Sequence, residues 1–337
     1  MTRYIRPIVQ SGPARPERAV QLAGGWAWFD KVEVLSRDAA PQVVGMDALG
    51  PAEVQRLTTP RADIASLSLD RPRIMGILNV TPDSFSDGGK HHALEAAVAG
   101  AAAMAQADIL DIGGESTRPG AQVVPDAEEI DRTAPVIEAL REDGSTKAIS
   151  IDTRKSAVAQ AARAAGADLV NDVSGFTYDR ELAPFCANTG AAVCVMHAQG
   201  DPQTMQDNPQ YDDVLLDVYD FLDRQIEHLV TAGIPRDRII ADPGIGFGKT
   251  LEHNLALLAR LSLFHSLGVP ILLGASRKRF IGTIGGEADA ARRTPGSLAV
   301  ALAALKHGTQ IVRVHDVPET AQAIALWQAV VAGQAHG

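Results

Sequence analysis

Polar and charged side chains follow nearly every short apolar run of this sequence, and their types indicate what they could bind. The positions directly after the runs are Asn79, 114–120, 152–154, 171–172, His197, 242–244, 276–279 and 313–316. In a barrel of parallel strands, the carboxyl ends of the strands share one rim, where binding sites form. A single such residue is often only a helix cap, but recurrence at so many run ends favours one shared site.

The residues after the runs provide two kinds of chemistry. Directional hydrogen-bond donors and acceptors come from Asp152, Asn171, Asp242 and Lys278, and they suit a flat, nitrogen-rich heterocycle. Cationic donors come from Arg118, Arg313 and His315, and they suit phosphate or carboxylate groups. Together these residues predict a ligand that joins a heterocycle to an anionic tail.

Asn79 ends the first apolar run and precedes a polar, glycine-rich stretch, 81–89, which we expect to form a loop near the ligand. A metal ion at this rim is expected to be Mg²⁺, held loosely by Asn79, water and substrate phosphates. The neighbouring pair His91 and His92 does not suggest zinc, because adjacent residues on a helix do not share a face.

Residues 243–250, PGIGFGKT, resemble a phosphate-binding P-loop, but Pro243 occupies the position of the first glycine. The flexible nest of backbone amides that binds phosphate is then lost. We therefore expect this loop to pass close to a bound ring rather than to bind a nucleotide.

A regular alternation of short apolar runs and alanine-rich amphipathic segments positions these residues. The predicted strands are 74–79, 109–112, 148–151, 169–171, 192–196, 239–241, 271–273 and 311–314. The predicted helices are 93–107, 127–141, 156–165, 214–232, 251–267, 298–307 and 319–331. Eight such units favour an α/β fold of the (β/α)8 TIM-barrel type, although an open doubly wound sheet would give the same local signals.

The first part of the chain, 1–72, lacks this alternation and is expected to be an N-terminal extension, followed by a barrel domain at 73–337. Within the extension, 26–35 alternates like a strand, and 50–57, with Pro51 near its start, could form a short helix. No chemistry is assigned to it.

Composition limits the classes of partner. The 337 residues are 46% hydrophobic, and the formal net charge of −10 disfavours binding to nucleic acid or to an anionic membrane. Cys186 and Cys194 lack the spacing of metal ligands and are expected to be buried thiols of a reducing compartment. The sequence starts without the apolar core of a signal peptide, and it lacks the ~20-residue apolar run of a membrane helix. We therefore expect a cytoplasmic protein.

Seven stretches resemble the dihydropteroate synthases, in the order typical of that family. They are MGILNVTPDSFSDGG from Met75, DIGGESTRPGA from Asp111, NDVSG from Asn171, MHAQGDPQTMQ from Met196, ADPGIGFGKT from Ala241, GASRKRFIG from Gly274 and RVHDV from Arg313. The resemblance covers 73 to about 332. It implies a (β/α)8 barrel and a transferase of folate biosynthesis that joins 6-hydroxymethyl-7,8-dihydropterin diphosphate to 4-aminobenzoate and releases diphosphate. It also implies Mg²⁺ and a homodimer.

The resemblance assigns roles residue by residue. It implies a pterin pocket formed by Asp152, Asn171, Met196, Asp242, Phe247, Lys278 and Arg313. It implies a diphosphate site formed by Asn79, Thr117, Arg118, Arg313 and His315, with Asn79 as the metal ligand. It implies a 4-aminobenzoate site formed by Phe85, Thr117, Pro119, Gly246, Ser276, Arg277 and Arg279. Asn79, Lys278 and Arg313 would be the catalytic residues.

This assignment requires no nucleophilic side chain, because positioning and electrostatic stabilisation suffice to release diphosphate. Three positions, Ser156, Ala275 and Arg279, differ from residues common in the family. Arg279 bears on how the aminobenzoate carboxylate is held. Two alternatives are a pterin-binding homologue without activity and a methyltetrahydrofolate-dependent corrinoid methyltransferase, but the latter would not need 276–278 or a diphosphate site.

Overall fold

Eight parallel strands form the central sheet in the computed structural model, which describes residues 3–80, 89–116, 121–200 and 204–334. The strands are β6 (Arg73–Asn79), β7 (Ile109–Gly113), β8 (Ala148–Asp152), β9 (Leu169–Asp172), β10 (Ala192–Met196), β11 (Ile239–Asp242), β12 (Leu272–Leu273) and β13 (Ile311–Val314). Their order is β11-β10-β9-β8-β7-β6-β13-β12, and a parallel bridge between Ala241 and Ile271 joins the two ends. The predicted (β/α)8 barrel is confirmed, and the open sheet is wrong.

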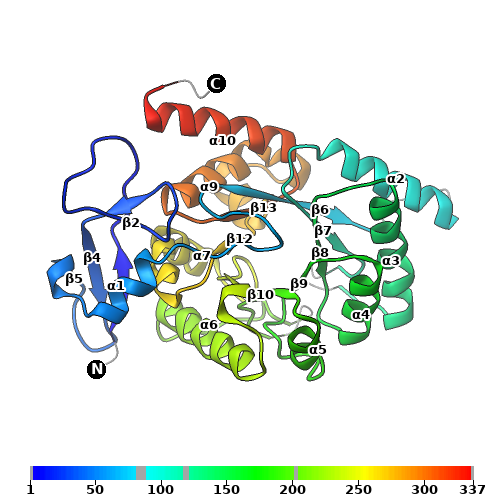
Figure 1. Cartoon of the computed structure of the whole chain (residues 1–337), viewed down its shortest axis with the longest axis horizontal. Coiled ribbons are helices and arrows are strands. Elements are labelled where there is room, and N and C mark those ends of the chain that lie inside the picture. The colour runs from blue at the N-terminus through cyan, green and yellow to red at the C-terminus, as the bar shows by residue number, and fades with distance from the viewer. Residues whose placement is uncertain (1–2, 81–88, 117–120, 201–203, 335–337) are drawn as a thin grey trace.

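Helices surround the barrel and pack on the outer faces of the strands (Figure 1). They are α2 (Gly89–Ala103), α3 (Asp126–Glu142), α4 (Ser156–Ala165), α5 (Leu182–Thr189), α6 (Val214–Thr231), α7 (Leu251–Ala259), α8 (Arg279–Gly285), α9 (Thr294–Lys306) and α10 (Val317–Ala332). The single helix predicted over 251–267 is wrong, because α7 ends at Ala259 and a 3₁₀ segment, η4 (Leu261–Leu267), follows. All residues of η4 are buried, so packing determines its conformation.

The register of the strands brings the polar residues at their carboxyl ends to one level. Asn79 pairs with Gly113, Gly113 with Asp152, and Asp152 with Asn171 across β6 to β9. Each of these strands is apolar and mostly buried, as expected for a parallel sheet that is covered on both faces. The polar ends therefore form part of one rim.

The N-terminal extension contains an antiparallel sheet with the order β1-β4-β5. Its elements are β1 (Tyr4–Pro7), β2 (Val20–Gln21), β3 (Trp28–Phe29), β4 (Lys31–Leu35), β5 (Gln42–Gly45), η1 (Met46–Ala48) and α1 (Pro51–Thr58). The helix predicted at 50–57 is confirmed, whereas the strand predicted at 26–35 is divided into β3 and β4.

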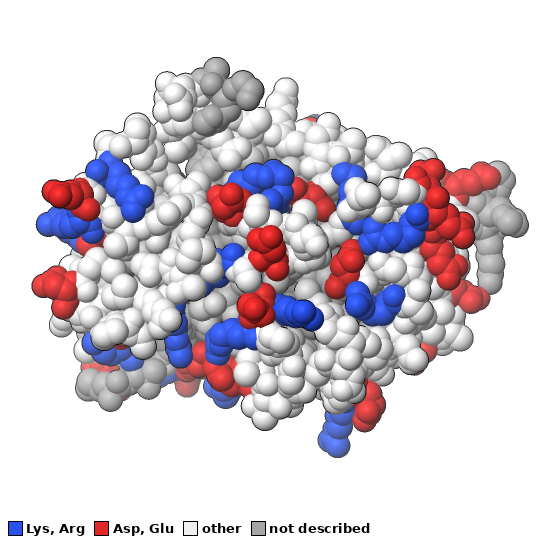
Figure 2. Space-filling model, viewed as in Figure 1, with Lys and Arg blue, Asp and Glu red and all other residues white. Residues whose placement is uncertain are grey.

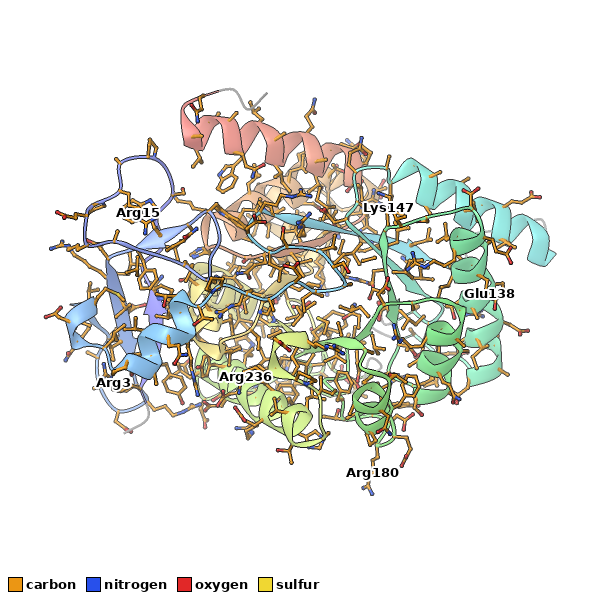
Figure 3. All side chains as sticks on the ribbon, viewed as in Figure 1. Arg3, Arg15, Glu138, Lys147, Arg180 and Arg236 are labelled. Atoms are coloured by element: carbon orange, nitrogen blue, oxygen red, sulfur yellow. The ribbon has the colours of Figure 1, made fainter. Side chains whose placement is uncertain are left out.

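The extension lies beside α6, η4 and the end of α9, at one end of the molecule (Figure 1). Ser262 donates a hydrogen bond to the Pro7 carbonyl at 2.9 Å, and the Trp26 indole donates to the Leu305 carbonyl at 3.1 Å. In Figure 3, Arg3 and Arg15 of the extension lie on the opposite side of the view from Glu138 of α3.

The segment just before β6 closes the floor of the barrel. Ile64 and Leu69 are almost completely buried, and they pack, with Leu67 beside them, against the apolar side chains near the amino ends of the strands. These side chains are Met75, Ile109, Ala148, Leu169, Ala192, Cys194, Ile240, Leu272 and Ile311. The rim with the polar residues is the opposite end.

The surface carries charges of both signs. On the face shown in Figure 2, acidic and basic side chains are interspersed. Among the described helices, none combines the length and the apolar character that a membrane span requires. Both cysteines are free and buried, and burial raises the pKa of the Cys186 thiol to about 12.

Candidate active site

An arginine bridges two buried carboxylates at the centre of the rim. Arg313 of β13 donates from Nε to Asp111 at 2.5 Å and from Nη2 to Asp152 at 2.6 Å. The Asn171 amide nitrogen also lies 3.3 Å from Oδ2 of Asp111, the oxygen that accepts from Arg313. Side chains from β7, β8, β9 and β13 are thereby joined in one hydrogen-bonded group.

In this group, one carboxylate oxygen of Asp152 remains available to accept a hydrogen bond. Burial raises the pKa of Asp152 to about 7, against the opposing effect of the Arg313 guanidinium. Burial alone would lower the pKa of Arg313, but the Asp111 and Asp152 carboxylates hold it above its ordinary value. Oδ1 of Asp152 is buried and has no partner among the described residues. A ligand with an N–H group could satisfy it, since a buried acceptor without a partner is costly.

A second group lies at the ends of β11 and β12. A Cβ at Gly274 would lie 3.6 Å from Asp242 and 3.8 Å from the Arg313 side chain, so the two groups are adjacent. Lys278 lies with Nζ 4.4 Å from the centre of the Phe247 ring and donates to the Ile245 carbonyl. Burial lowers the pKa of Lys278 to about 8, although Asp242 opposes this shift.

Met196 and Gly246 complete this second group. Met196 is buried and pairs with Asp242 across β10 and β11. A Cβ at Gly246 would lie 3.1 Å from the Lys278 side chain, so the loop passes close to it. The two groups together contain a methionine, an aromatic ring, three carboxylates, an amide and two cations, which suits a flat polar heterocycle.

Asn79 lies beside these groups, at the exposed end of β6. A Cβ at the neighbouring Gly113 would lie 3.7 Å from its amide oxygen and 3.8 Å from Asp152. The described residues contain no cluster of three or more His, Cys, Asp or Glu side chains that could enclose a metal ion. One amide oxygen at an exposed strand end fits Mg²⁺, which keeps several waters and takes its other ligands from substrate phosphates.

The remaining predicted residues differ in their surroundings. Ser276 and His315 are in contact, with 3.0 Å between Oγ and Nδ1. Arg277 instead forms a two-pronged ion pair with Asp316, and Arg279 is exposed at the start of α8. The structure therefore does not bring these two arginines into the central group. The other predicted residues, Phe85, Thr117, Arg118 and Pro119, lie outside the described residues.

Asp111 is a site residue to which neither the residue pattern nor the family resemblance gave a role. It is completely buried and contacts both Arg313 and Asn171. A carboxylate in the middle of the apolar run ILDIG was a usable signal, because a buried charge requires a partner.

A buried ion network holds residues 115 and 124, which lie on either side of 117–120 in the sequence. The carboxylate of Glu115 accepts from the Val124 backbone at 2.9 Å and from Arg154 at 3.2 Å. Lys155 donates to the Val124 carbonyl and to Glu129, each at 2.6 Å. Residues 115 and 124 are thus held to the end of β8.

Comparison with known proteins identifies relatives across the barrel. The family described as pterin binding enzyme matches residues 75–315. The chain is 46% identical over 271 residues to the dihydropteroate synthase of Escherichia coli, which covers 80% of this chain and 95% of the relative. It is 46% identical over 264 residues to the enzyme of the same name from Synechocystis, covering 77% and 91%.

Solved structures agree with this comparison. A dihydropteroate synthase from Xanthomonas albilineans with 4-aminobenzoic acid has a TM-score of 0.75 and 48% identity, covering 81% of this chain and 98% of the other. The same organism's enzyme in complex with 7,8-dihydropteroate has a TM-score of 0.72 and 44% identity, covering 80% and 98%. The uncovered part of this chain corresponds in length to most of the extension.

Proposed function

The chain belongs to the dihydropteroate synthases, within the pterin-binding enzyme family, and on this premise we propose how its rim holds the two substrates. The enzyme is a transferase of folate synthesis that joins a pterin diphosphate to 4-aminobenzoate. The observation that supports our assignment of the pterin site is the buried group of Asp111, Asp152, Asn171 and Arg313, in which Asp152 retains a free acceptor.

The pterin would lie across this group. Asp152 and Asp242 would accept hydrogen bonds from its N–H groups, and Asn171 would both donate and accept. Lys278 would donate to a ring acceptor, with Met196 and Phe247 on the faces of the ring. Asp111 would hold the Arg313 guanidinium level, so that its plane can stack on the heterocycle.

The diphosphate tail would extend toward Asn79 and His315. Asn79 would hold Mg²⁺ through its amide oxygen, and bound Mg²⁺ would neutralise charge on the diphosphate leaving group. Arg313 would add a positive charge, and Thr117 and Arg118 would complete the anion site. Asn79, Lys278 and Arg313 would therefore act by electrostatic stabilisation at the carbon that loses diphosphate.

The 4-aminobenzoate amine would then attack this carbon. Its pocket would be formed by Ser276, Gly246, Phe85, Thr117, Pro119, Arg277 and Arg279, with Gly246 beside Lys278 of the pterin site. Arg277 pairs with Asp316, so its guanidinium is oriented by that carboxylate. We propose that the exposed Arg279 contributes to binding the substrate carboxylate by charge attraction.

We also propose that the enzyme is a homodimer and works in the cytoplasm. Helix α10 has no charged residue after Glu319, yet Leu326 and Val330, one turn apart, are 65% and 71% exposed. An apolar pair this exposed on a helix without charges in that part is expected to be covered, and a second copy of the chain would cover it. The two free, buried thiols suit a reducing compartment.

The test of this function is release of diphosphate in the presence of Mg²⁺. We expect release only when both the pterin diphosphate and 4-aminobenzoate are present. Binding of the pterin without release would instead support a homologue that only binds pterins.

The same assay tests the metal ligand. Asn79→Ala should raise the Mg²⁺ concentration for half-maximal activity by about tenfold or more, because the protein's own ligand is lost. Asn188→Ala, an exposed asparagine of α5, is the control. Equal Mg²⁺ responses in the wild type and Asn79→Ala would refute this role of Asn79.

A further inference from the structure

We propose that Lys249 is a positioning residue of the pterin pocket, which holds the loop 243–250 in the shape that presents Phe247 and the Ile245 carbonyl. The inference deepens the proposed function and depends on it. Lys249 ends the GFGK sequence that resembles a P-loop, and the roles assigned above do not include it.

The contacts of Lys249 are confined to its own loop and to the residue after β10. The side chain is 3% exposed. Its Nζ lies 2.8 Å from Nδ1 of His197, 2.9 Å from the Gly244 carbonyl and 3.0 Å from the Phe247 carbonyl. The His197 carbonyl lies farther away, at 3.4 Å, so the three nearer acceptors match the three donors of an ammonium group. The side chain therefore joins both halves of the loop to the end of β10.

The loop needs such an anchor because of its backbone. Gly244, Gly246 and Gly248 all have positive φ, at 66°, 83° and 60°. A Cβ at Gly244 would lie 1.8 Å from the His197 carbonyl, so the loop lies directly on β10's end. Alternating left-handed glycines prevent regular backbone pairing in this loop, so its carbonyls depend largely on side-chain donors. The Gly244 carbonyl accepts from the Phe247 backbone at 3.2 Å and from Lys249, and the Phe247 carbonyl accepts from Lys249.

The anchored carbonyl and the pterin-facing ring belong to the same residue, Phe247. Nζ of Lys249 lies 3.0 Å from the Phe247 carbonyl oxygen, and Nζ of Lys278 lies 4.4 Å from the centre of the Phe247 ring. Lys278 also donates to the Ile245 carbonyl, within the segment that Lys249 fixes. Displacement of this loop would therefore move both the ring and the proposed pterin donor.

This geometry differs from that of a phosphate-binding lysine. The amine points into the protein, and burial lowers the pKa of Lys249 well below its ordinary value, with the Lys278 charge adding to the shift. Burial and Lys249 together lower the pKa of His197 to about 2, so that ring is neutral. A charged Lys249 can donate to three acceptors, and a neutral one can accept from the ring and donate to both carbonyls, so either state keeps the loop anchored.

The loop after β10 supports the outer side of the same segment. The Tyr211 hydroxyl donates to the Gly248 carbonyl at 2.7 Å, and the Gln206 amide donates to the Gly246 carbonyl at 2.7 Å. The His197 ring packs edge-on against Phe221 at 4.8 Å, which fixes the acceptor for Lys249. Lys249 therefore holds the inner side of the loop 243–250, and Tyr211 and Gln206 hold its outer side.

The experiment compares Lys249→Met with Lys147→Met in the full-length enzyme. Methionine keeps the volume but removes the Lys249 donor from the Phe247 carbonyl and one of the two donors to the Gly244 carbonyl, so we expect the Kd of the pterin to rise by about tenfold. The KM for 4-aminobenzoate at saturating pterin should change much less. Lys147 also donates to two carbonyls, those of Ala105 and Ala107, each at 2.7 Å, but it precedes β8 at the amino ends of the strands and is labelled in Figure 3. Lys147→Met should lower Tm without changing the Kd of the pterin.

A Lys249→Met enzyme with a lowered Tm but wild-type pterin affinity would overturn the inference, because Lys249 would then serve stability alone. If Lys249→Met does not fold, Lys249→Gln replaces it. Glutamine keeps a polar head on a shorter side chain that cannot reach all the Lys249 acceptors, so pterin binding should weaken several-fold, and an unchanged Kd would again overturn the inference. A wild-type enzyme that releases no diphosphate would contradict the proposed function instead, so the two failures are distinguishable.

Discussion

Replacement of Arg313 by methionine should reveal how strongly the rim depends on one cation. The change removes the hydrogen bonds to Asp111 and Asp152 at 2.5 and 2.6 Å. Asp111 is completely buried, so it cannot gain water in exchange. Breaking a buried ion pair on one side costs about 3–5 kcal/mol. We expect Arg313→Met to lower the free energy of unfolding by that amount at pH 8.5.

The loss should depend on pH in a definite direction. The pKa of Asp152 is already raised from 3.8 to about 7 in the folded protein, because burial outweighs the effect of Arg313. A raised folded-state pKa favours folding while the carboxyl is protonated, and this contribution is lost as the pH rises toward 7. Without Arg313 the pKa is higher still, so the loss continues above pH 7, by up to about 1.4 kcal/mol per pH unit for one proton. The deficit of the variant should therefore grow from pH 5.5 to pH 8.5.

Urea unfolding at pH 5.5, 7 and 8.5 measures this deficit. Arg180→Met, an exposed arginine labelled in Figure 3, is the control and should stay within about 0.5 kcal/mol of the wild type. The double variant Asp152→Asn with Arg313→Met should lose less stability than Arg313→Met alone, because one unpaired charge is gone. A deficit that is constant or that shrinks as the pH rises would refute this reasoning.

Two further predictions concern affinity and assembly. Pterin affinity, measured by fluorescence titration, should rise up to about pH 7 as Asp152 ionises and fall above about pH 8 as Lys278 loses its proton. Lys278→Ala should weaken binding and abolish the decrease in affinity above pH 8. A decrease that persists in this variant would contradict the role of Lys278. Leu326→Glu should convert the proposed dimer to a monomer in sedimentation experiments, because the new charge would be buried against the partner. The control Glu138→Gln, on the exposed side of α3, should leave the dimer intact. A dimer that survives Leu326→Glu would exclude α10 from the interface.

The barrel could be predicted because each strand has a local signature. A run such as AISID, buried at every position, carries its own strand signal and ends in the carboxylate that reaches the rim. A glycine that follows an alanine-rich segment likewise indicates a helix end, and Gly166 adopts a left-handed φ of 111° at the end of α4. These features depend on neighbours along the chain, which the sequence displays directly.

Features that depend on contacts between distant segments could not be predicted. The sequence places Arg313 at a strand end but does not show that its side chain crosses to β7 and β8. Arg277 pairs with Asp316 and has a positive φ of 59°, a backbone conformation that residue type alone does not predict. The short helices α5 and α8 contain Pro184 and Gly282, which obscured their helical pattern.

The hairpin at 64–69 means that the extension cannot be regarded as a detachable attachment to an independent barrel. Ile64 and Leu69 seal the end away from the substrates, and each buried side chain of this size contributes about 1.5–3 kcal/mol. A chain trimmed to begin at Arg73 would keep every rim residue yet admit water to the lowest apolar layer. Residues at the end of the barrel opposite the substrates would therefore determine whether the rim keeps its shape.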